Sequence, residues 1–168
     1  MHYRNLQQQA ASIRLDILDA ISQAKKGHIG GAFSSVELMV ALFHGGLLKF
    51  DSIQPEWPER DYFILSKGHV GVVLYATLAS VGFFEKEQLM ELNQGGLLGE
   101  HPDRRIPGVE VDSGSLGHGL GIAAGIALSL HMDKKTNKTV VLLGDGECYE
   151  GSTWESALFA THMELNNL

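Results

Sequence analysis

Residues 139–147 read Thr139-Val140-Val141-Leu142-Leu143-Gly144-Asp145-Gly146-Glu147, and they are the most informative segment of the chain. A short β-branched and apolar run is typical of a buried strand, and here it ends in one acidic residue between two glycines. Such a turn can place a carboxylate beside a phosphate-bound metal ion, and glycines let the backbone come close to a phosphate. Taken alone, the Gly-Asp-Gly triplet favours an ordinary turn over a metal site, because Asp-Gly pairs are common in turns.

The composition predicts a globular protein that forms one domain over residues 1–168. The net charge is −7, and the absence of any Lys/Arg-rich run argues against a nucleic-acid partner. The apolar runs are too short to span a membrane, and the N-terminus lacks the apolar core of a secretory signal. The single cysteine, Cys148, excludes an internal disulfide and fits a reducing cytoplasm.

The alternation of helices and short apolar strands predicts an α/β domain with a mainly parallel sheet flanked by helices. Helices are predicted over residues 5–25, 34–47, 69–81, 85–93, 116–130 and 153–164, and strands over 62–65 and 140–143. Ser34-Ser35-Val36-Glu37 fits a capping box at the start of the second helix. Small apolar residues in 116–130 predict close packing against another helix or a second subunit. Ligands bind beyond the carboxyl ends of parallel strands, so we expect His69 and Asp145 on one rim.

Four of the eight histidines lie in loops rich in glycine or proline, namely His28, His69, His101 and His118. One such histidine is more often structural, but loops on a rigid scaffold carry function disproportionately. Their spacing is not that of a zinc site. Imidazoles around an anion suit a phosphorylated or polyhydroxylated substrate, because they donate hydrogen bonds and move protons near neutral pH. No nucleophile elbow or Walker motif is present, and the glycine-rich segment 117–121 does not follow a strand, which argues against a dinucleotide fold.

In this order, the motifs resemble the N-terminal part of transketolase. The resemblance rests on residues 26–31, 66–69, 99–102, 114–119 and 144–151, and it covers nearly the whole chain. The details are most similar to the N-terminal subunit of bacterial or archaeal transketolases that are split over two polypeptides. The resemblance implies the diphosphate-binding domain of a thiamine diphosphate-dependent enzyme, which moves a two-carbon ketol unit from a ketose to an aldose.

The resemblance also implies a cofactor and metal site. Asp145 resembles the ligand of a divalent ion, which is Mg²⁺ or, in its place, Ca²⁺ or Mn²⁺. Gly146 resembles a backbone contact to the cofactor diphosphate, and His69 resembles a side-chain contact to it. Gly114 and Leu116 resemble residues that line the cofactor site.

Further residues resemble the sugar-facing and interface positions of the family. His28 and His101 resemble histidines that face the sugar phosphate near the reacting ring of the cofactor. His118 stands where many transketolases have glutamine, and we take it as a third sugar-facing residue. Glu150 resembles a carboxylate at the subunit interface that links two cofactor sites.

The resemblance implies parts that lie outside this sequence. A second metal ligand, an asparagine, is expected roughly thirty residues after Asp145, whereas the chain ends at Leu168, and Asn166 and Asn167 come too early to replace it. Without the strand that would follow, residues 140–143 would keep an open edge. We therefore expect a fragment, a truncated product or a domain completed by another chain. The glutamate that activates the cofactor belongs to a pyrimidine domain, so the expected partner is a C-terminal transketolase subunit, in a homodimer or heterotetramer.

Two alternatives stay open at this point. One is a non-catalytic binding or regulatory module that keeps the fold but not tight cofactor binding. The other is a related thiamine diphosphate enzyme, such as a deoxyxylulose-phosphate-synthase-like or sulfoacetaldehyde-type protein. The combination of His28, His69 and His101 favours transketolase over these enzymes.

Overall fold

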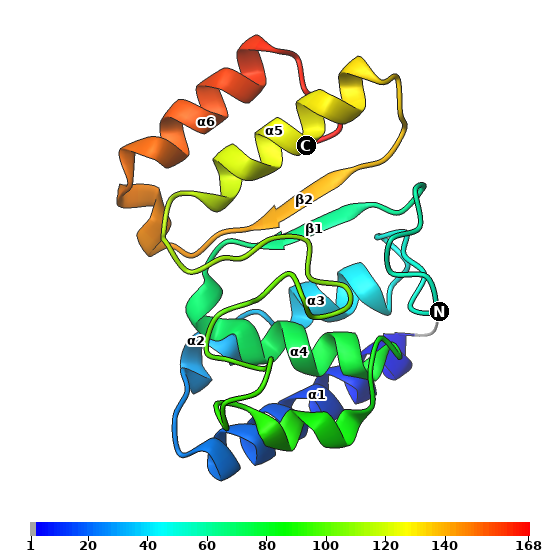
Figure 1. The fold of residues 1–168 in the computed structure, drawn as a ribbon, viewed down its shortest axis with the longest axis vertical. Coiled ribbons are helices and arrows are strands. Elements are labelled where there is room, and N and C mark those ends of the chain that lie inside the picture. The colour runs from blue at the N-terminus through cyan, green and yellow to red at the C-terminus, as the bar shows by residue number, and fades with distance from the viewer. Residues whose placement is uncertain (1–2) are drawn as a thin grey trace.

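The sheet is parallel and lies between two layers of helices (Figure 1). The computed structural model describes residues 3–168. Strand β1, Tyr62–Leu65, pairs with β2, Thr139–Leu142, so that Tyr62 lies opposite Thr139 and Leu65 lies opposite Leu142. Because the strands are parallel and in register, the segments that follow them emerge at the same rim. The predicted α/β class and the shared rim are confirmed.

The helices divide between the two faces of the sheet (Figure 1). One face carries α1 Tyr3–Ala24, α2 Ile29–Phe33, α3 Val36–Phe43 and α4 Gly71–Ser80, and the other carries α5 Gly119–Met132 and α6 Gly151–His162. Three short 3₁₀ helices are η1 Gly68–Val70, η2 Lys86–Glu91 and η3 Gly146–Tyr149. The predicted helices are present, except that residues 85–93 form only a 3₁₀ helix. The short helix α2 was not predicted.

The main core fills the layer between the sheet and α1, α3 and α4. Phe63 and Leu65 of β1 and Val140 and Leu142 of β2 point into it, as the two-residue period of a strand requires. The predicted helical spacing in α1 is confirmed, because its buried side chains include Ile13 and Ile17, both fully buried. Complete burial of such a side chain stabilises the fold by about 1.5–3 kcal/mol. A smaller cluster between α5, α6 and the C-terminal residues covers the other face.

The predicted capping box at the start of α3 is wrong. Ser34 and Ser35 both donate their hydroxyls to the Gly31 carbonyl, at 2.9 and 3.0 Å, instead of capping α3. Glu37 accepts two hydrogen bonds from the Arg14 guanidinium, at 2.6 and 2.8 Å. Because α2 precedes α3 almost directly, its last carbonyls are the nearest acceptors for the serine hydroxyls. The serine hydroxyls therefore bind to α2, although α3 still begins at Val36.

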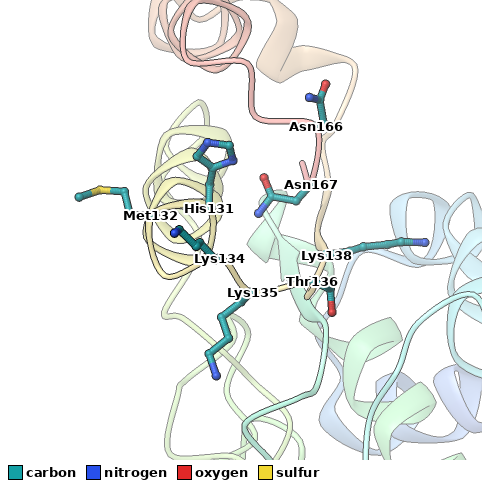
Figure 2. A pocket seen from close by; sticks show the side chains of 8 residues that line it. All are labelled: His131, Met132, Lys134, Lys135, Thr136, Lys138, Asn166 and Asn167. Carbon is teal, nitrogen blue, oxygen red and sulfur yellow. The ribbon is translucent and has the colours of Figure 1, made fainter.

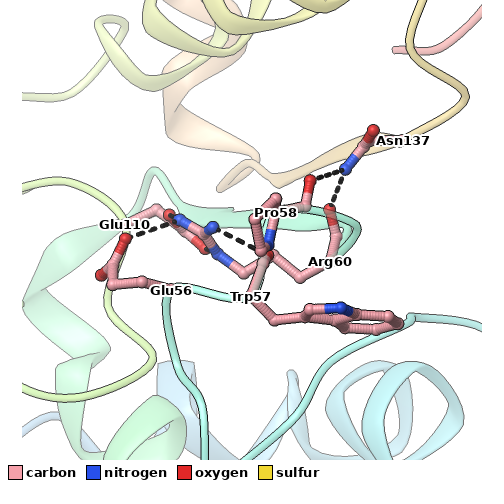
Figure 3. Close-up of polar contacts among 6 residues, drawn as sticks. All are labelled: Glu56, Trp57, Pro58, Arg60, Glu110 and Asn137. Carbon is pink, nitrogen blue, oxygen red and sulfur yellow. Dashed lines mark hydrogen bonds and ion pairs between the residues drawn. The ribbon is translucent and has the colours of Figure 1, made fainter.

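Polar side chains fasten the loop before β1 at the amino ends of the strands (Figure 3). Arg60 pairs with Glu110 through two bonds of 2.9 Å, and Asn137 donates to the carbonyls of Pro58 and Arg60 at 3.0 and 2.6 Å. Asp61, which is 4% exposed, accepts the backbone N–H groups of Lys49 and Lys138. These hydrogen bonds fix this end of the sheet, although within residues 3–168 the buried Thr139 hydroxyl beside them has no partner.

The outer edge of β2 carries no further strand within residues 3–168. Val140 to Leu142 are accordingly half-buried. The Thr139 N–H donates to the Asn167 carbonyl at 2.7 Å, so the last residues run beside the start of β2. Asn166 and Asn167 line a hollow of about 640 Å³ there, together with His131 and lysines of the turn after α5 (Figure 2). They lie at the opposite end of the sheet from Asp145, which agrees with their exclusion as metal ligands.

No helix in the described part of the chain is both long enough and apolar enough to cross a bilayer.

Candidate functional site

Loops that are distant in the sequence meet at the carboxyl ends of β1 and β2. The segment after β1 packs closely against the segment before α5. The approach is so close that a Cβ added to Gly68 would lie 2.6 Å from the Gly114 nitrogen. The turn after β2 approaches the same place, since a Cβ on Gly144 would lie 3.5 Å from the Lys67 Cβ. The rim thus gathers the motifs that the sequence singled out (Figure 1).

Three of the predicted histidines are brought together at this rim. The rings of His28 and His69 meet edge to face, with centroids 5.2 Å apart. Burial lowers the pKa of His69, and the nearby charges of His28, Lys67 and His101 lower it further. The His69 ring is therefore neutral at physiological pH, and it can donate one hydrogen bond and accept another.

An ion pair joins the His28 loop to the His101 loop. The Lys26 ammonium lies 2.6 Å from one carboxylate oxygen of Glu100, and the His28 Nε2 lies 3.4 Å from the other. The hydrogen bond with the Lys26 side chain is the main reason that the pKa of Glu100 lies below its usual value. Glu100 is thus ionised and is shared by the two loops. Neither Lys26 nor Glu100 was predicted as a site residue, although both flank predicted histidines.

Gly114 allows the His101 ring to lie directly against the backbone. Its φ is +144°, and a Cβ there would lie 2.5 Å from the His101 Cδ2 atom. A larger residue would be strained in this conformation and would displace the imidazole. The Tyr75 hydroxyl donates to the His101 carbonyl at 2.8 Å, which fixes the backbone of the same loop. Gly114 and His101 therefore form one packed unit.

Lys67 links the histidine cluster to the Gly-Asp-Gly turn. Burial lowers the pKa of Lys67, whereas the nearby charges of Asp145 and Glu147 raise it. Its ammonium also reaches the Ser34 hydroxyl at 3.5 Å. An ammonium and imidazoles on one side of a turn and a carboxylate on the other are chemical groups that suit an anion carrying a metal ion.

Asp145 and Gly146 are both exposed at the start of η3. A Cβ on Gly146 would meet no atom within 4 Å, so the backbone there faces open space. Within residues 3–168 no group of three or more histidine, cysteine, aspartate or glutamate side chains is arranged to hold a metal ion. The single carboxylate fits Mg²⁺, which takes hard oxygen ligands and commonly completes its shell with substrate phosphates and water.

The remaining predicted residues lie on the turn before α5 and opposite it. Leu116 is partly exposed, and the His118 Nδ1 lies 3.2 Å from the Leu116 carbonyl. Within residues 3–168, His118 shares no hydrogen bond or ring contact with the other three histidines. Glu150 lies against this turn, because a Cβ on Gly117, whose φ is +84°, would sit 2.7 Å from the Glu150 Cβ. His118 is thus set apart from the histidine cluster, while Glu150 adjoins the rim.

Sequence reasoning missed Ser66 and Glu147, the residues that connect the loops. Glu147 is fully buried, and its carboxylate accepts hydrogen bonds from Ser66, Gly117 and Gly144. The only signal in the sequence was the acidic residue directly after Gly-Asp-Gly. An acidic residue in a glycine-rich turn ordinarily faces solvent, so its burial could not be inferred without the partner loops.

Comparison with known proteins places the chain in a family. The family described as "Transketolase, thiamine diphosphate binding domain" matches residues 6–168. The chain belongs to the transketolase family. It is 45% identical to the "6-deoxy-6-sulfo-D-fructose transketolase subunit SqwG" of Clostridium sp. (strain MSTE9), over 98% of this chain and 60% of that protein. It is 38% identical to an apulose-4-phosphate transketolase subunit of Phocaeicola vulgatus, over 100% of this chain and 60% of that protein.

Solved transketolase structures have the same fold. The transketolase of Campylobacter jejuni superposes with a TM-score of 0.93 at 27% identity, covering 100% of this chain and 28% of that one. A transketolase mutant from Pichia stipitis gives a TM-score of 0.90 at 31% identity, with 97% and 26% covered. The chain spans 60% of the length of the two subunits described above. The resemblance found in the sequence, including its similarity to split transketolases, is confirmed.

Proposed function

We propose that this chain is the diphosphate-binding component of a thiamine diphosphate-dependent transketolase. It would transfer a two-carbon ketol unit between sugar phosphates together with a subunit that carries the pyrimidine-binding domain. The observation that carries the proposal is the convergence of His28, His69 and His101 with Asp145 at one rim, in a chain whose family is defined by thiamine diphosphate binding. The cytoplasm is the proposed location.

The proposed cofactor site uses the turn after β2 and the loop after β1. Asp145 would hold Mg²⁺, and Gly146 would present its backbone to the diphosphate, because open space lies around it. The neutral His69 ring would donate a hydrogen bond to a diphosphate oxygen. Gly114 and Leu116 would line the cofactor, and Glu150 would face the partner subunit.

The proposed substrate site uses the histidines on the outer side of this rim. Thiamine diphosphate supplies the carbanion chemistry when it is bound. His28 and His101 would orient the sugar hydroxyls and move protons to or from them, since imidazole exchanges protons near neutral pH. Glu100 would hold the His28 ring in place through the 3.4 Å contact with Nε2. His118 would serve as a further contact for the sugar or its phosphate.

The names of the relatives indicate which donors to test. One is named for 6-deoxy-6-sulfo-D-fructose and another for apulose 4-phosphate, so both compounds join xylulose 5-phosphate as candidate donors, with ribose 5-phosphate as an acceptor. All three donors carry an anionic group at the end of the sugar. Lys26, whose side chain is 60% exposed beside His28, offers a positive charge at the rim for such a group.

The test is a ketol-transfer assay on the protein with and without a transketolase subunit that carries the pyrimidine domain. We expect turnover only with both chains, thiamine diphosphate and Mg²⁺ present, and we expect one donor to be preferred. Absence of transfer from every donor in the complete mixture would overturn the proposal. If the mixture also failed to bind the cofactor tightly, the chain would instead be a non-catalytic binding or regulatory module of the same fold.

A further inference from the structure

The carboxylate of Glu147 is the most deeply buried charge near the rim. The residue is fully buried, whereas Asp145, Cys148 and Tyr149 around it are exposed. A buried carboxylate is costly unless hydrogen-bond donors surround it. One oxygen accepts from the Ser66 hydroxyl at 2.5 Å and from the Gly117 N–H at 2.9 Å, and the other accepts from the Gly144 N–H at 2.8 Å. Charge-assisted bonds of this kind are among the strongest in proteins.

The three donors come from three different loops of the candidate site. Ser66 stands directly before the Lys67–His69 segment, and Gly117 follows the turn that contains Gly114 and Leu116. Gly144 stands directly before Asp145. A single carboxylate therefore joins the segments that carry the proposed diphosphate, cofactor-lining and metal contacts.

The network continues through the partners of Glu147. The Ser66 hydroxyl also accepts from the Gly119 N–H at 3.1 Å, so it ties the start of α5 to the end of β1. A Cβ on Gly119 would collide with this hydroxyl. The Thr153 hydroxyl donates to the Glu147 carbonyl at 2.8 Å, which joins the first turn of α6 to η3. Ser66 and Glu147 thus connect the end of β1, the start of α5 and the start of α6.

We propose that Glu147 is the positioning residue of the cofactor site. It does not touch the cofactor but sets the distance between the Asp145 turn and the loops that hold His69 and Gly114. This inference rests on the function proposed above. It assigns to Glu147 a role in binding that is separate from its contribution to stability.

A matched structural control exists at the other end of the sheet. Asp61 is also a buried carboxylate that accepts two backbone N–H groups, from Lys49 at 2.9 Å and Lys138 at 2.7 Å. It ties the amino ends of the strands, far from the rim. Glu147→Gln and Asp61→Asn both replace one acceptor oxygen by an amide group of nearly the same shape. Each leaves a donor facing a buried donor, so both are expected to lower the thermal stability.

The experiment compares thiamine diphosphate binding, in the presence of Mg²⁺, by the wild-type protein and these two variants, each assembled with the pyrimidine-domain subunit. Calorimetry is expected to show the Kd of Glu147→Gln raised by about tenfold or more, while Asp61→Asn keeps the wild-type Kd. In amide NMR spectra of the free chain, Glu147→Gln should shift the Gly117 and Gly144 signals, and Asp61→Asn those of Lys49 and Lys138. Ser66→Ala, which removes one of the three donors to Glu147 and also the acceptor of the Gly119 N–H, should likewise weaken binding.

The outcomes separate this inference from the proposed function. If the wild-type assembly binds the cofactor and Glu147→Gln binds it equally well, the positioning role is overturned and the proposed function stands. Equal losses of affinity in Glu147→Gln and Asp61→Asn would reduce Glu147 to a structural residue. If the wild-type assembly binds no thiamine diphosphate, the proposed function fails, and the positioning role fails with it.

Discussion

At the scale of single residues, the Asp145 carboxylate is exposed to solvent and available to a ligand. It is exposed at the end of β2, and within residues 3–168 no side chain forms a hydrogen bond with its carboxylate. Its neighbour Gly146 adds no side chain to block access. Such a carboxylate contributes little to folding, so its replacement separates ligand binding from stability.

We therefore expect Asp145→Asn to leave the melting temperature nearly unchanged and to lower the Mg²⁺-dependent affinity for thiamine diphosphate. The loss should be at least ~10–100-fold, the range found when even an outer partner of a metal ligand is removed. Calorimetry and thermal denaturation measure the two effects. Asp133→Asn, an exposed aspartate after α5, is the control and should change neither. Unchanged affinity in Asp145→Asn would remove Asp145 from the metal site.

The lowered pKa of His69 makes the free energy of unfolding depend on pH. Burial and the neighbouring cations lower its pKa in the folded chain below the value of about 6.5 expected when unfolded. The unfolded chain therefore binds more protons in the window between the lowered pKa and 6.5, so the free energy of unfolding rises with pH there and falls on acidification. His44, whose pKa burial also lowers, adds a contribution of the same sign.

His69→Gln should make the dependence shallower between the lowered pKa and pH 6.5, with no change of slope above neutrality. Urea unfolding at a series of pH values gives this slope directly. A variant with the full wild-type slope would show that His69 is not the group that resists protonation.

At the scale of the elements, the two strands and most helices follow from local sequence alone. The runs 62–65 and 139–142 are short, apolar and bounded by polar turns, so they were located within one residue. Helix α2 was missed because Gly30 and Gly31 disfavour a helix in isolation. Tertiary packing overrides that preference, since a Cβ on Gly31 would lie 2.7 Å from the Val70 side chain.

The site residues were predictable only where a family motif marked them. The histidines and Asp145 stand in recognisable segments, and the parallel strands bring them to one rim. Glu147 and Ser66 were missed because their role depends on loops that are 81 residues apart in sequence. Lys26 and Glu100 were missed for the same reason, as their ion pair exists only after the loops meet.

Asn137 tests the junction between the loop before β1 and the start of β2 (Figure 3). Its amide satisfies the carbonyls of Pro58 and Arg60, and the residue is 5% exposed. Asn137→Ala would leave both carbonyls without this donor, at a cost of about 1–3 kcal/mol in the free energy of unfolding. Chemical denaturation measures this loss. Asn166 is exposed and lines the hollow, so Asn166→Ala should change the free energy of unfolding little. Equal losses of stability in the two variants would contradict the role given to Asn137.

Helix α5 contains one glycine, Gly125, at which the fold of this chain leaves room for a side chain. Gly125 is exposed, and a Cβ there would meet no atom within 4 Å. Gly125→Ala should therefore raise the free energy of unfolding of the isolated chain by about 0.5–1 kcal/mol, because alanine loses less entropy in a helix. The matched variant Gly121→Ala should gain less, since its Cβ would lie 3.0 Å from the Ser156 hydroxyl. Destabilisation by Gly125→Ala would show that the space beside it is filled.

At the scale of the whole molecule, the two ends of the sheet have different roles. The amino end stabilises the fold, and the carboxyl end carries the candidate site. The amino end is closed by Asp61, Arg60 and Asn137, whose buried polar groups are satisfied by hydrogen bonds. At the carboxyl end, basic side chains such as Lys67 and the acidic Asp145 lie near one another around the buried Glu147. Both helical layers contribute to that rim, so a ligand bound there contacts loops from both halves of the fold and stabilises the chain as a unit.

The position of the metal ion in a crystal of the protein assembled with a pyrimidine-domain subunit, thiamine diphosphate and Mn²⁺ tests the proposed role of Asp145. Anomalous diffraction locates the ion without assumptions about the ligand. We expect a peak within coordination distance of the Asp145 carboxylate, roughly 2.0–2.6 Å, with the diphosphate between the ion and His69. A metal ion elsewhere, or a diphosphate bound away from this rim, would contradict it.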